Sequence, residues 1–78
     1  MNTEFIIKVV PNADPEFLKV MEQIPDPSKQ TQEKVMSFLQ QLHDLFLQKR
    51  KAAESGDHDL FIQIMEKEMR IIAELDNN

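Results

Sequence analysis

The chain has 78 residues, with no Cys, Trp or Tyr, one Gly, four Pro and a formal net charge of −5. This length excludes a multidomain enzyme, because domains rarely fall below about 50 residues. Hydrophobic residues make up 41% and charged residues 29%, a balance typical of a folded domain rather than of a disordered chain. We therefore expect residues 1–78 to form a single small domain that folds without disulfides.

The charge balance and the N-terminus indicate the surroundings of the protein. Fourteen acidic residues against nine basic ones disfavour binding to the phosphates of a nucleic acid. No apolar run approaches the roughly 18 residues that span a bilayer, and residues 1–4 lack the basic residues that begin a signal peptide. We expect a cytoplasmic protein that binds neither nucleic acid nor membrane.

The first apolar segment, residues 4–10 (EFIIKVV), is short and rich in β-branched residues. This pattern is typical of a strand with Phe5, Ile7 and Val9 on one face. The backbone groups of a lone strand are unpaired on both edges, so such a strand needs a partner. The segment is therefore predicted to be either a paired strand or an extended, flexible arm.

Two Asp-Pro pairs mark the starts of the next two predicted helices, because Asp caps the free N–H groups of a first turn and Pro suits the first helical position. Asp14-Pro15 begins a short helix over residues 15–24, which Pro25 ends. Asp26-Pro27-Ser28 begins a long helix over residues 27–54. Its apolar stripe has the 3–4 spacing of a helix that packs along its length: Val35, Phe38, Leu42 and Leu45.

The tripeptide Ser55-Gly56-Asp57 predicts a tight connection. Gly56 can adopt the left-handed conformation that closes a helix, and Asp57 can cap a last helix over residues 58–75. A loop this short makes the two long helices an antiparallel hairpin. The predicted fold is mainly all-α: a short N-terminal extended segment, a short helix and a long helical hairpin, which would form a helical bundle on self-association.

The apolar faces of the hairpin helices are wider than a single neighbour can cover. We expect the seam between them to contain Phe38, Leu42, Phe61 and Ile72. The surplus predicts self-association or partner binding through Met36, Leu47, Ile62 and Met69, although core filling is the alternative role for the Met residues. Lys49 and Glu68 interrupt the apolar stripes within about one helical turn of each other along the hairpin. They are predicted to pair or to reach the charge of a partner, unless Lys49 extends to solvent.

No set of residues predicts catalysis. The possible nucleophiles and bases are scattered along the chain, and turn or surface roles explain them: Ser28, Ser37, Ser55, His43 and His58. We expect His43 to form a surface pair with the adjacent Asp44. Asp57-His58-Asp59 has metal-ligand chemistry, but charge complementarity at a helix N-terminus explains these acids. We expect no catalytic residue, no metal site and no cofactor.

Two resemblances frame the functional hypotheses. The order strand, helix, helix resembles the ribbon-helix-helix repressors and antitoxins. Residues 51–69 (KAAESGDHDLFIQIMEKEM) resemble the helical hairpin of a short antikinase that blocks sporulation histidine kinases, over a quarter of the chain. We expect a small non-enzymatic helical protein–protein interaction module (an adaptor, regulator, inhibitor or co-chaperone) that binds another protein and forms a homo-oligomer, with a dimer favoured. The alternative is a strand-helix-helix DNA-binding regulator or antitoxin.

Overall fold

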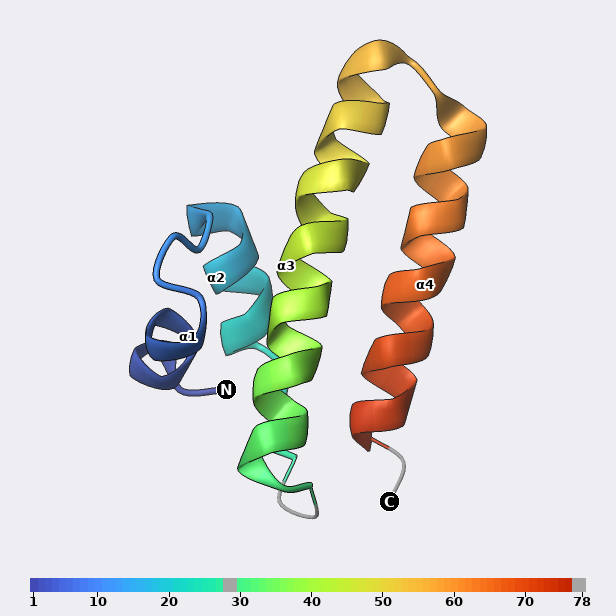
Figure 1. Ribbon diagram of the computed structural model, residues 1–78. Helices are drawn as coiled ribbons and strands as arrows, with labels where there is room; N and C mark the ends of the chain where they lie inside the picture. Colours follow the sequence, from blue (N-terminus) through green and yellow to red (C-terminus); the bar gives the residue numbers. More distant parts are fainter. Residues whose placement is uncertain (28–29, 77–78) are drawn as a thin grey trace.

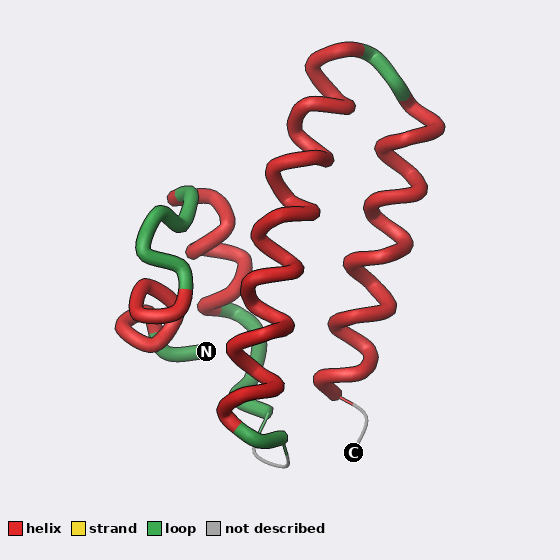
Figure 2. Tube along the Cα trace, viewed as in Figure 1, coloured by secondary structure: helices red, strands yellow, loops and turns green. Residues whose placement is uncertain are grey.

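The computed structural model describes residues 1–27 and 30–76. Over these residues the chain forms four helices and no strand: α1 (Thr3–Val9), α2 (Pro15–Glu22), α3 (Gln32–Ser55) and α4 (His58–Asp76). In Figure 1, α3 stands between α4 on one side and the α1–α2 pair on the other, and Figure 2 shows the loops that join them. The predicted all-α fold with its long helical hairpin is confirmed.

Residues 4–10 do not form a strand or an extended arm, so that prediction is wrong. Asn2 caps α1 by accepting hydrogen bonds from the backbone N–H groups of Glu4 and Phe5. The buried side chains are Ile6, Val9 and Val10, which recur at helical spacing, and Ile7 on the expected strand face is exposed. Burial of this helical face against the core overrides the β-propensity of the segment.

The next two helices differ from the prediction at their ends. Helix α2 begins where expected and ends at Glu22, two residues early. Helix α3 begins at Gln32, five residues later than expected, because the side chain of Thr31 accepts the free N–H of Lys34 and caps the helix there. Pro27 is not helical, and Ser28 of the expected cap lies outside the described residues.

The hairpin turn follows the predicted chemistry. Gly56 has φ 74°, a left-handed conformation. The N–H of Asp57 donates to the carbonyl of Ala52 and the N–H of Gly56 to that of Ala53, the paired bonds of a Schellman helix end. Asp57 Oδ1 then accepts the N–H of Leu60 at 3.1 Å and caps α4. Local residues alone thus set the reversal between α3 and α4.

The main core lies between α3 and the first two helices. Apolar side chains of α1 and α2 pack on one face of α3, and the end of α4 adds one residue: Ile6, Val9, Val10, Phe17, Met21, Val35, Leu39, Leu42 and Leu75. Helix α4 packs mainly against α3. Helices α1 and α2 therefore cover the surplus apolar face of α3, but they leave more of the apolar face of α4 exposed.

Within the described residues, no helix combines the length and apolar content needed to cross a bilayer.

Candidate functional site

A groove of about 270 Å3 runs between α2 and α4, with α3 as its floor. Eight of its lining side chains are apolar and come from all three helices: Phe17, Val20, Met21, Leu42, Phe46, Met65, Met69 and Ile72. Lys49 and Glu68 complete the lining. We call this site the α2–α4 groove. Apolar concave surfaces with a few polar groups are the usual form of a binding site.

The walls of the groove are exposed where α2 and α4 face each other. Val20 on α2 has 50% of its surface exposed, and Met65 and Met69 on α4 have 38% and 62%. Met is flexible and polarisable, and it is common on surfaces that adapt to different partners. The groove therefore offers an apolar surface that the chain itself leaves uncovered.

The ion pair at the groove joins α3 to α4. Lys49 Nζ lies 2.8 Å from Glu68 Oε1, and their side chains are 25% and 12% exposed. The Lys49 ammonium also lies 5.5 Å from the ring centre of Phe46 and 6.0 Å from that of Phe61, within the range of a cation–π contact. The structure thus brings together the two charged residues that interrupt the apolar stripes.

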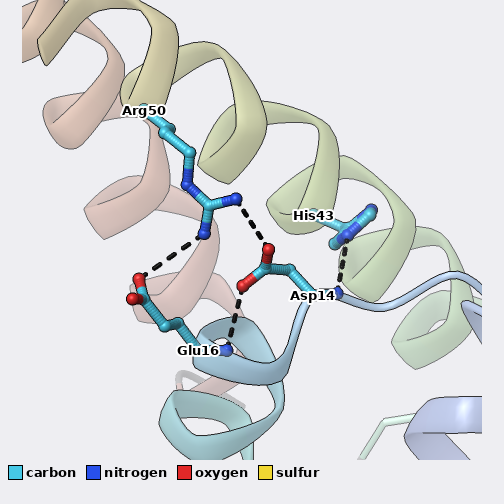
Figure 3. A network of polar contacts seen from close by, with 4 residues as sticks. All are labelled: Asp14, Glu16, His43 and Arg50. Atoms are coloured by element: carbon cyan, nitrogen blue, oxygen red, sulfur yellow. Dashed lines mark hydrogen bonds and ion pairs between the residues drawn. The ribbon is translucent and has the colours of Figure 1, made fainter. Parts of the chain in front are cut away.

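A polar network at the N-terminus of α2 fixes that helix against α3 (Figure 3). The Asp14 carboxylate accepts the N–H of Glu16 at 2.9 Å, which caps α2, and its other oxygen lies 2.6 Å from Arg50 Nη1. Arg50 Nη2 lies 3.5 Å from Glu16 Oε2. The hydrogen bond from Arg50 lowers the pKa of the Asp14 carboxyl from 3.8 to about 2. One carboxylate therefore caps α2 and ties it to α3.

His43 completes the attachment of α2. Its Nε2 accepts the backbone N–H of Asp14 at 3.3 Å, and its ring lies edge-on to Phe17 at 4.9 Å between centroids. Phe17 meets Phe46 in the same way at 5.7 Å. The expected surface pair of His43 with Asp44 is wrong, because Asp44 bonds to Gln48 instead. These contacts place His43 in a packing and hydrogen-bonding role beside the groove.

The four apolar residues predicted for binding are all exposed, but they do not form one patch. Met69 lines the groove, and Ile62 lies two turns earlier on the same side of α4. Met36 and Leu47, 37% and 38% exposed, lie on α3 outside the groove. Sequence reasoning did not single out Val20 or Met65. Both are apolar residues of their helices, but only the docking of α2 reveals that they line one groove.

A second groove, of about 380 Å3, lies between α3 and α4. Its lining combines two apolar residues with two cations, two amide or acidic residues and no α2 residue: Gln41, Asp44, Leu45, Lys67, Arg70 and Ile71. Helix α4 thus has a basic edge as well as the Met-rich edge of the α2–α4 groove.

Among residues 1–27 and 30–76, no group of three or more His, Asp or Glu side chains is arranged to hold a metal ion.

Comparisons of the chain with protein-family models, with curated proteins and with solved structures find no match.

Proposed function

We propose that this chain is a small non-enzymatic protein–protein interaction module that binds through the Met-rich edge of α4. The observation that supports this proposal most directly is the exposure of Ile62, Met65 and Met69, which recur at i, i+3 and i+7 along α4. Single exposed apolar residues are common, but a row of them on one helix face marks an interaction surface. The α2–α4 groove extends this row into a concave site.

The total surface of the chain supports the same proposal. By the usual scaling with mass, a monomeric protein of 9.1 kDa exposes about 4,900 Å2. This chain exposes 5495 Å2. The excess of about 600 Å2 approaches the roughly 800 Å2 that each partner contributes to a standard protein–protein interface. A partner bound to the exposed row of α4 would bury part of this surface.

The DNA-binding alternative loses its structural basis. It required residues 4–10 to form a strand that pairs and enters a groove of DNA. In the structure these residues belong largely to α1, whose Ile6 and Val9 are buried in the core. Nothing in the described part of the chain replaces that strand, so we do not propose DNA binding.

The test is a pair of matched substitutions on α4. Met69→Asp adds a charge to the exposed apolar row, whereas Gln63→Asp adds the same charge on a different side of the helix. Both variants should keep the helical circular dichroism of the wild type. We expect any complex of the wild-type chain, with itself or with a protein captured from an extract, to survive Gln63→Asp and to be lost with Met69→Asp. Equal behaviour of the two variants in light scattering and capture would refute the proposal.

A further inference from the structure

We infer that the occupant of the α2–α4 groove is a basic amphipathic helix of another protein. This inference rests on the proposed function and names its partner class. It combines three features of the described residues: the spacing of the apolar residues on α4, the charges that border them, and the poor fit of a second copy of this chain.

The apolar residues on the groove side of α4 have the spacing of a helix–helix seam. Ile62, Met65, Met69 and Ile72 follow one another at intervals of three, four and three residues, the a and d pattern that accepts the side chains of a facing helix. The row is about 15 Å long at 1.5 Å per residue, or roughly three turns. An apolar cavity of about 150 Å3 can hold a benzene molecule, so a groove of about 270 Å3 can take one or two large apolar side chains.

The charges bordering this row are mainly acidic. Asp59 and Glu66 each lie three residues before a row member, Ile62 and Met69, and so border the row on α4. Neither makes an ion pair within the described residues. On α2, Glu16 lies one turn before Val20. Its side chain is 77% exposed and shares the single cation Arg50 with Asp14, so two acids meet one base there. Arg70, one turn after Glu66, lies farther from the row, so the charged side chains nearest the row on this border are acidic.

The two cations that α3 places beside the groove are already paired. Lys49 contacts Glu68, and Arg50 contacts Asp14 and Glu16. They therefore offer little attraction to an acidic partner. A partner helix with Lys or Arg beside its apolar residues would place each cation next to an acid of the border, whereas an acidic helix would be repelled.

A second copy of this chain fits the groove poorly. In a two-fold antiparallel pairing of α4 with α4, the border with Asp59 and Glu66 would lie beside the same acids of its mate. In a parallel pairing, the same border would face the side that contains Glu68, which is already paired with Lys49, so the acids of the border would find no free cation there. The basic edge with Lys67 and Arg70 could meet the acids only in a head-to-tail contact, which leads to filaments rather than to a closed dimer.

The probe for this inference is a designed helical peptide of about 15 residues. It carries Leu at intervals of three and four residues, Lys on both flanks and a single Trp. Because the protein has no Trp or Tyr, the fluorescence of the peptide reports binding without background. A matched peptide has Glu in place of every Lys. We expect the basic peptide to bind about tenfold more tightly at low salt, with a preference that shrinks as salt is added.

Two charge reversals test whether the border residues cause this preference. Glu66→Lys changes the groove border, and Glu33→Lys makes the same change in net charge at an exposed site in the first turn of α3. We expect Glu66→Lys to weaken binding of the basic peptide by roughly 3- to 10-fold and Glu33→Lys to leave it within about 2-fold of the wild type. Equal weakening by both variants would show a net-charge effect and overturn the inference.

The remaining outcomes separate this inference from the proposed function. If both peptides bind equally and Met69→Asp abolishes both complexes, the groove binds helices but the basic occupant is wrong. If neither peptide binds, the inference is overturned, and the comparison of Met69→Asp with Gln63→Asp in capture decides the proposed function. If light scattering shows a dimer that Met69→Asp dissociates, the occupant is a second copy, which also overturns the inference.

Discussion

Truncation of Phe17 tests whether the α2–α4 groove depends on one buried contact. Phe17 is 1% exposed and joins α2 to α3 through edge-on contacts with His43 and Phe46. Replacement of a buried Phe by Ala costs about 3 to 5 kcal/mol, because burial is lost and a cavity remains. A domain of this length has a free energy of unfolding of about 4 to 12 kcal/mol. Phe17→Ala should therefore remove about a quarter or more of the total stability.

Urea denaturation followed by circular dichroism measures this loss. With a slope of about 1 kcal/mol per molar urea, typical of the smallest proteins, the midpoint should fall by about 3 to 5 M. The matched control is Val20→Ala, one turn later on α2, where the side chain is half exposed and the cost should stay below about 1 kcal/mol. If Phe17→Ala shifted the midpoint no more than Val20→Ala, our description of α2 as firmly packed on α3 would be wrong.

Three further predictions concern the turn, the Asp14 network and the ion pair. Gly56→Ala should lower the free energy of unfolding by about 1 kcal/mol, measured by thermal unfolding. The left-handed backbone is the source of this loss, because an added Cβ would meet no atom within 4 Å. A loss above about 3 kcal/mol would contradict this prediction. Because Arg50 lowers the pKa of Asp14 from 3.8 to about 2, the contribution of this carboxylate to stability is present above pH 4 and is lost as the pH falls from about 4 to about 2. The stability difference between wild type and Asp14→Asn should shrink over that range in acid titrations, and a constant difference would refute the role of the charge. In a double-mutant cycle, Lys49→Met should lower the free energy of unfolding more than Glu68→Gln does, because it leaves the carboxylate of Glu68, the less exposed of the two charges, without a partner. A larger loss for Glu68→Gln would contradict this reasoning.

The hairpin could be predicted because its signals are local. Gly56 and Asp57 specify the reversal within three residues, and the antiparallel register then places Lys49 near Glu68. The start of α3 was less predictable, because an Asp-Pro pair and Thr31 both offer cap chemistry and only the structure shows which one is used.

The N-terminal segment and the groove could not be predicted in the same way. The β-branched composition of residues 4–10 reports a local preference, whereas burial of Ile6 against distant helices decides the outcome. The groove depends on the docking of α2 on α3, which includes the contact between Asp14 and Arg50, 36 residues apart in the chain. Periodic patterns in a sequence do not predict a contact between such distant residues. The sequence therefore could not show that Val20 and Met65 line the same groove.

The double role of Asp14 couples the formation of α2 to its docking. An eight-residue helix is too short to persist alone in water, so detachment of α2 from α3 should also melt it. The hairpin, with its own turn and seam, can outlast that event as a separate cooperative unit. Amide hydrogens of α2 should then exchange with solvent sooner than those in the middle of α3. A bound partner would slow their exchange even at amides it does not touch, because only the closed form presents the complete groove.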